Sequence, residues 1–130
     1  MNTRIQKLPL PALLFFLYAA SPFFSSSAYA KTQIGTAVYY SDKMHGTGVS
    51  LKGDKYDKTA LTAATHQGYR LGSMVRVTNL SNHKSVTVKI NDRMNPKSKA
   101  VIDLSRKAAE EIGMIKNGHT KVRIQSLRTK

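Results

Sequence analysis

The sequence predicts a small, mainly β domain, a barrel or a sandwich that carries one short helix. Most of the chain alternates apolar and polar residues with a period of two, which is typical of strands with one buried face. Only one segment spaces its apolar residues at helical intervals. Residues 31–130, which follow an N-terminal leader, contain no linker-like stretch, and their length is that of a domain with one core.

Residues 1–30 have the pattern of a secretory signal peptide. Arg4 and Lys7 form a basic start, residues 9–20 are apolar, and Ala28-Tyr29-Ala30 provides the small residues of a cleavage site. The apolar run of about 12 residues is shorter than the roughly 20 that a membrane-spanning helix needs. We therefore expect cleavage after Ala30 and an exported protein, periplasmic or extracellular. The chain has no cysteine for a lipid anchor.

The alternating segments predict five strands. They are residues 33–40, 61–64, 74–80, 85–91 and 119–127. The polar residues 81–84 have the length of a hairpin connection between the third and fourth strands. Tyr39 and Tyr40 are neighbours in the first strand, so one ring is expected to face the core and the other to face outward.

The segment with helical spacing is residues 104–114, where Leu104, Ala108 and Ile112 recur on one face. Asp103 precedes it and Gly113 stands near its end, which are the residue types that favour helix caps. Asp103 is therefore interpreted as a structural N-cap.

The charge of the chain is strongly basic, with 21 Lys and Arg against 7 Asp and Glu. The leader holds two basic and no acidic residues, so the mature chain carries a net charge of +12. Such a surface favours an anionic partner, either a wall polymer or a membrane surface. The basic residues are spread along the chain, and no zinc finger, recognition helix or aromatic RNA platform is evident, so nucleic acid is not expected as a partner.

Three of the seven carboxylates are candidates for chemistry. Glu110 and Glu111 fit an exposed helix face, and Asp42 fits a turn. Asp54 and Asp57 lie in a non-periodic loop, and Asp92 ends a predicted strand, where scaffolds often display reactive groups. The alternative is structural, with Asp54 and Asp57 forming turns and Asp92 pairing with Arg93 or a lysine.

A series of motifs gives the sequence a recognisable resemblance. In chain order they are Gly35-Thr36-Ala37-Val38-Tyr39-Tyr40, Gly53-Asp54-Lys55-Tyr56-Asp57, Leu61-Thr62-Ala63-Ala64, Ile90-Asn91-Asp92-Arg93 and Ile102-Asp103-Leu104-Ser105. Together they resemble the rare lipoprotein A family of double-psi β-barrels, whose relatives include expansins and barwin-like domains. The resemblance covers residues 35–127.

The resemblance implies a six-stranded double-psi β-barrel with one or two short helices and a polysaccharide groove. It implies a lytic transglycosylase that cuts the MurNAc–GlcNAc bond of peptidoglycan, prefers peptide-poor strands, and leaves 1,6-anhydro ends. Asp54 and Asp57 would act at the glycosidic bond, with Asp92 fixing the groove or tuning their ionisation. The expected substrate-binding residues are His66, Tyr40 and Arg93. Neither a metal nor an organic cofactor is expected, and the protein is expected to be a monomer.

The sequence departs from the family pattern at four places. Asp54 replaces a glutamate, Thr65-His66 stands where the family has a single histidine, Tyr69-Arg70-Leu71-Gly72 lacks the usual Leu-Pro before the glycine, and Met94-Asn95 replaces Gly-Pro. These changes keep a second hypothesis open, in which the domain binds and loosens wall glycan without cleaving it, as expansins do. The nature of the products separates the two hypotheses.

Overall fold

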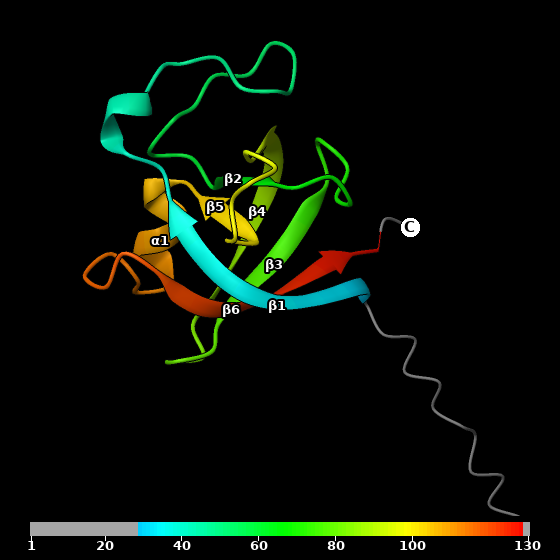
Figure 1. Ribbon diagram of the computed structural model, residues 1–130, viewed down its shortest axis with the longest axis vertical. Coiled ribbons are helices and arrows are strands. Elements are labelled where there is room, and N and C mark those ends of the chain that lie inside the picture. The colour runs from blue at the N-terminus through cyan, green and yellow to red at the C-terminus, as the bar shows by residue number, and fades with distance from the viewer. Residues whose placement is uncertain (1–28, 129–130) are drawn as a thin grey trace, which may run out of the picture.

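The computed structural model describes residues 29–128, and within them six strands close into a barrel (Figure 1). The elements, in chain order, are β1 (Tyr29–Tyr39), the 3₁₀ helix η1 (Asp42–Met44), β2 (Thr62–Thr65), β3 (Met74–Asn79), β4 (Ser85–Arg93), β5 (Ile102–Leu104), α1 (Arg106–Glu111) and β6 (Thr120–Leu127). The strand order around the barrel is β1-β5-β2-β4-β3-β6. This confirms the expected six-stranded double-psi barrel with short helices.

The pairing of the strands is mixed. The β1–β5 and β2–β4 pairs are parallel, and the other four pairs are antiparallel. The parallel pairs require long connections over the barrel, whereas residues 80–84 join β3 to β4 directly as the predicted hairpin. His83 in this turn adopts a positive φ of 63°.

The core is built from the inward residues of the alternating strands. The buried apolar side chains of β3, β4 and β6 are Val75, Val77, Val86, Val88, Ile90, Val122 and Ile124. Each such side chain contributes about 1.5–3 kcal/mol when removed from water. At Gly35 the packing leaves no room for a side chain, because an added Cβ would lie 2.3 Å from Cγ1 of Val101. The alternating inward side chains thus fill the interior of the barrel and stabilise it.

The helix begins later than the sequence pattern predicts, and the N-cap assignment of Asp103 is wrong. Asp103 lies in the middle of β5, and the N-cap is Ser105, whose Oγ accepts a hydrogen bond from the Ala108 amide at 3.2 Å. The reason is that Ile102 and Leu104 alternate inward as strand residues and are fully buried. The expected glycine at the helix end is confirmed, since Gly113 adopts a positive φ of 68°.

The predicted signal peptide lies outside the described residues, apart from Tyr29 and Ala30, which begin β1. Its cleavage therefore stays a prediction. In the part of the chain that the structure describes, no helix is both long and apolar enough to span a bilayer.

The connection from β1 to β2, residues 40–61, crosses above the end of the barrel where β2, β4 and β5 lie (Figure 1). Leu51 donates its amide hydrogen to the Asn91 carbonyl of β4 at 2.9 Å, and the Tyr56 side chain is buried. Gly48 and Lys55 form a bridge within the connection itself. The connection is thereby fixed against β4.

Candidate active site

Two carboxylates lie on neighbouring strands of the same barrel face. Ala64 of β2 is paired in register with Asp103 of β5 on one side and with Asp92 of β4 on the other. Residues in direct register share a face, so Asp92 and Asp103 flank Ala64, with Cα atoms about 10 Å apart at two strand spacings. A shift in register between Ala63 and Ala64 brings Asp92 to this position. The outer face beneath the 40–61 connection therefore holds a pair of acids.

Asp92 is held by hydrogen bonds on both oxygens. Its Oδ2 accepts a bond from the Tyr40 hydroxyl at 2.5 Å, and its Oδ1 accepts bonds from the Ser50 hydroxyl at 2.7 Å and the Ser50 amide at 2.9 Å. The Arg93 amide donates a further bond to Oδ1 at 2.8 Å. Burial acts to raise the pKa of Asp92, but these bonds outweigh it and hold the pKa below its usual range. Asp92 is a fixed negative charge.

Asp103 has the opposite environment. Its Oδ1 is buried and has no hydrogen-bond partner among the described residues. Burial, together with the negative charge of Asp92, raises the pKa of Asp103 from 3.8 to about 6. A carboxyl with this pKa keeps its proton in mildly acidic water. Two acids whose environments separate their pKa values in this way are a common basis for general acid catalysis.

Tyr39 and Tyr40 point to opposite sides of the chain, as expected for neighbours on a strand. Tyr39 packs against the core and donates its hydroxyl proton to the Ile115 carbonyl at 3.2 Å. Tyr40 turns outward, where its ring stacks on Tyr56 with 4.4 Å between centroids and its hydroxyl reaches Asp92. Burial and the hydrogen bond to Asp92 raise the pKa of Tyr40 well above its usual range, so its hydroxyl stays a donor. Tyr40 therefore orients Asp92, and Tyr56 supports Tyr40.

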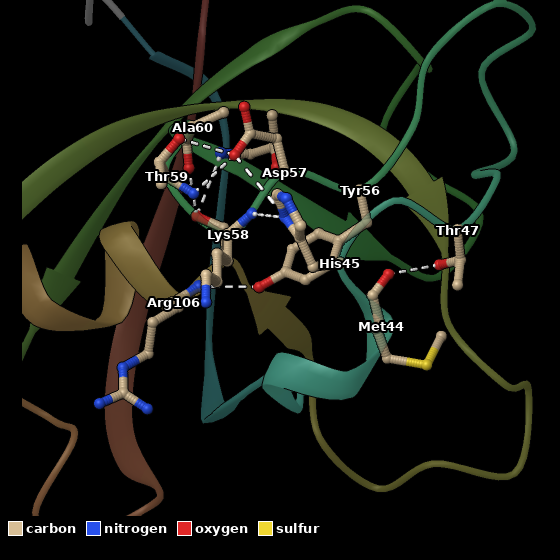
Figure 2. A network of polar contacts seen from close by, with 11 residues as sticks. Met44, His45, Thr47, Tyr56, Asp57, Lys58, Thr59, Ala60 and Arg106 are labelled. Atoms are coloured by element: carbon tan, nitrogen blue, oxygen red, sulfur yellow. Dashed lines mark hydrogen bonds and ion pairs between the residues drawn. The ribbon is translucent and has the colours of Figure 1, made fainter.

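Asp57 and Asp54 lie in the 40–61 connection, each in its own polar cluster. Asp57 is exposed and accepts hydrogen bonds from the Thr59 hydroxyl at 2.7 Å and the Thr59 amide at 2.8 Å, as Figure 2 shows. The side-chain and backbone bonds from Thr59 lower the pKa of Asp57. Asp54 instead pairs with Lys89 of β4 at 3.1 Å between Oδ2 and Nζ. Neither contact is with Asp92 or Asp103.

His45 and His66 also bond outside the acid pair. Nδ1 of His45 accepts a hydrogen bond from the Lys58 amide at 3.2 Å (Figure 2). Nε2 of His66 lies 3.0 Å from the Ala100 carbonyl and 3.2 Å from the Ser98 carbonyl, so it carries a proton and donates to them. The His45 ring thus bonds to a backbone group within the 40–61 connection, and the His66 ring bonds to backbone groups of the connection between β4 and β5.

The end of β2 shows how Thr65 and His66 share the place where the family has a single histidine. Thr65 takes the last position of β2 and is fully buried, and His66 follows it in the loop. Nη1 of Arg93 donates to the Thr65 hydroxyl at 3.4 Å and to the His66 carbonyl at 3.3 Å. Arg93 and His66 then line a hollow of about 510 Å³ together with Gln67, Met94 and Pro96. These two predicted binding residues therefore border the same concave surface.

Within the described residues, His, Asp and Glu side chains form no group of three that could hold a metal ion. The acid pair and the hydroxyl groups around it are instead suited to moving protons and stabilising charge.

Residues 32–124 match the model of a family described as lytic transglycolase. The chain belongs to this family. It is 42% identical over 102 residues to the endolytic peptidoglycan transglycosylase RlpA of Pseudomonas aeruginosa, an alignment that covers 78% of this chain and 29% of that protein. The RlpA of Neisseria meningitidis is 41% identical over 96 residues, with 74% and 39% covered. The chain thus spans about a third of the length of these relatives.

Solved structures show the same barrel in other proteins. An expansin of Clavibacter michiganensis superimposes with a TM-score of 0.60 and 18% identity, covering 77% of this chain and 52% of the expansin. A Streptomyces papain inhibitor superimposes with a TM-score of 0.59 and 20% identity, covering 77% and 97%. At identities this low, the two structures show only that these proteins share the fold of this chain.

Sequence reasoning missed Asp103 and Ser50 as members of this site. The sequence does contain a pattern that could have identified Asp103. A single polar residue between Ile102 and Leu104 is typical of a short strand whose middle side chain points outward. For Ser50 the sequence carries no comparable signal, since its contact with Asp92 depends on how residues 40–61 cross the barrel.

Proposed function

We propose that this protein is an exported lytic transglycosylase that cleaves MurNAc–GlcNAc bonds of peptide-poor peptidoglycan strands and leaves 1,6-anhydro ends. The observation that carries the proposal is the pair Asp92 and Asp103, which share one barrel face and have pKa values shifted in opposite directions. Membership in the lytic transglycolase family and the names of the RlpA relatives support this choice of reaction.

Asp103 supplies the proton in the first step. Its carboxyl donates the proton to the glycosidic oxygen as the bond from that oxygen to C1 of MurNAc breaks and positive charge develops on the sugar ring. The 6-hydroxyl oxygen of the same MurNAc then bonds to C1. Its proton passes to the Asp103 carboxylate, which restores the acid, and no water is consumed.

Asp92 stabilises the developing positive charge and does not accept the proton. A carboxylate offers about four acceptor positions, and Asp92 already accepts four hydrogen bonds, from Tyr40, from the amide and hydroxyl of Ser50, and from the Arg93 amide. Its charge is therefore available without rearrangement, which is the condition for electrostatic catalysis. The same charge adds to the effect of burial, which is the larger cause of the raised pKa of Asp103.

Asp54 and Asp57 contact the sugar from the 40–61 connection. Hydrogen bonds lower the pKa of Asp57, and Asp54 pairs with Lys89, so both are suited to accept hydrogen bonds from sugar hydroxyls. Tyr40 positions Asp92, while Arg93 and His66 border a hollow and bind the strand there.

The working protein is residues 31–130, released by cleavage after Ala30 and acting as a monomer outside the cytoplasm. The alternation of the mature sequence and the closed barrel support one independently folded domain. Its net charge of +12 draws it to anionic wall polymers and membrane surfaces, an attraction that salt screens over about 10 Å at 0.1 M.

The test is product analysis with purified residues 31–130 and peptide-free glycan strands. We expect fragments with 1,6-anhydro ends from the wild type and none from Asp103→Asn. Reducing ends would indicate hydrolysis and contradict the proposal. Binding without any cleavage would favour the expansin-like alternative.

A further inference from the structure

Three hollows lie along the loop between β2 and β3. The hollow that Arg93 borders shares Gln67 and Arg93 with a second hollow, which shares Gly68, Tyr69 and Arg70 with a third. The third, of about 530 Å³, ends at Lys31 of β1 and Leu127 of β6. The three hollows therefore form one path, which we call the 66–73 groove.

The groove is lined by cations and by no carboxylate among the described residues. Arg93, Arg70 and Lys31 follow one another along it. The ion pairs within residues 29–128 involve other side chains, so no described carboxylate lies within 4.0 Å of these three cations. In a chain with 21 basic residues exposed cations are common, but a continuous concave row without a counter-charge favours an anionic ligand.

The end of the groove is shaped to hold Lys31 in place. Its ammonium lies 4.2 Å from the ring centroid of Tyr69 and donates to the Gly68 carbonyl at 3.3 Å. Gly68 has a φ of 123°, and a Cβ there would stand 2.9 Å from the Lys31 ammonium nitrogen. The Tyr69 hydroxyl in turn donates to Gln33 at 3.1 Å. Lys31 is thus oriented by neutral partners, and no described carboxylate pairs with its ammonium group.

We propose that the 66–73 groove binds the continuation of the glycan strand and that Arg70 and Lys31 pair with free lactyl carboxylates of MurNAc. This inference rests on the proposed function, because it takes a peptidoglycan strand as the ligand. In peptide-free glycan each lactyl group ends in a carboxylate, whereas a stem peptide converts that group into a neutral amide. The groove would therefore act as a specificity element that selects strands without peptides.

The experiment measures binding of glycan strands in two forms, one with free lactyl carboxylates and one with those groups converted to methylamides. Binding is measured by calorimetry in an Asp103→Asn background so that strands stay intact. The test variant is Lys31→Gln with Arg70→Gln, and the matched control is Lys116→Gln with Lys121→Gln. The control pair removes the same charge at exposed positions that line none of the three hollows.

We expect the test variant to bind the free-carboxylate strand about tenfold more weakly, equivalent to about 1.4 kcal/mol, with the control pair unchanged. The protein with Lys31 and Arg70 intact should bind the methylamide strand more weakly than the free-carboxylate strand by a similar factor. The test variant should bind both strand forms equally. Equal losses for both strand forms, equal losses in the control pair, or no loss would overturn the proposal.

A thermal melt of each variant shows that the barrel is intact, and the single variant Arg70→Gln replaces the pair if the pair fails to fold. The outcome is also separable from that of the proposed function. Release of anhydro ends together with an unchanged test variant would reject the groove alone. Carboxylate-dependent binding by a protein that cleaves nothing would reject the transglycosylase reaction and leave the groove in place.

Discussion

The Asp103→Asn substitution should stabilise the folded protein at neutral pH. The native environment raises the pKa of Asp103 from 3.8 to about 6, so ionising this group in the folded state costs up to about 3 kcal/mol relative to the unfolded chain. Partial exposure to water reduces this figure, and we expect about 1–3 kcal/mol. Asparagine matches the shape of the protonated carboxyl and removes the cost.

The effect should depend on pH in a defined direction. Between about pH 4 and pH 6 the folded protein binds more protons at Asp103 than the unfolded chain, so the free energy of unfolding falls as pH rises through this window. Asp103→Asn should therefore equal the wild type near pH 4 and exceed it at pH 7.5. For a domain of this size each kcal/mol corresponds to about 4–8 °C in Tm.

The assay is thermal or urea unfolding of both proteins at pH 4 and pH 7.5, followed by circular dichroism. A variant that is less stable than the wild type at pH 7.5 would refute the reasoning. So would a stability difference that is the same at both pH values, because it would show that the effect does not come from ionisation.

Three further predictions follow from the same geometry. The rate of anhydro-end release should fall about tenfold per pH unit above about pH 6, as Asp103 loses its proton, and a rate that is flat to pH 8 would contradict this assignment. Tyr40→Phe removes a hydrogen bond that lowers the pKa of Asp92, so NMR titration of Asp92 should show a higher pKa than in the wild type. Ser105→Ala should cost about 2 kcal/mol in urea unfolding, because the hydroxyl caps α1 and donates to the Ala60 carbonyl at 2.6 Å, and a loss below about 0.5 kcal/mol would show that the cap is dispensable.

The strands could be predicted closely because each has one buried face. Alternation places β3, β4 and β6 within two residues of their observed bounds, and it is strong there because the inward valines and isoleucines are all needed to fill the barrel. β5 was missed as a separate strand. It has only three residues, and its last residue, Leu104, continues in phase with the apolar spacing of α1.

The candidate site could be predicted only in part. Period-two geometry placed Asp92 at the end of a strand and predicted that one of Tyr39 and Tyr40 faces outward, but it did not say which of the two does. The role of Asp103 depended on its register with Ala64 and Asp92, which requires knowledge of which strands are neighbours. Asp57 bonds to Thr59, two residues further on, which fits the turn role that the sequence allowed. The contact of Asp54 with Lys89 joins residues 35 apart and could not be predicted from the local sequence.

The central claim is that Asp103 is the proton donor. It is tested most directly by the rate of anhydro-end release from peptide-free strands, compared between wild type, Asp103→Asn and the matched loop variant Asp57→Asn. We predict a loss of about 10²–10⁴-fold for Asp103→Asn, the range of a lost general acid, and a loss below about tenfold for Asp57→Asn. A wild-type rate in Asp103→Asn, or a loss in Asp57→Asn as large as that in Asp103→Asn, would contradict the claim.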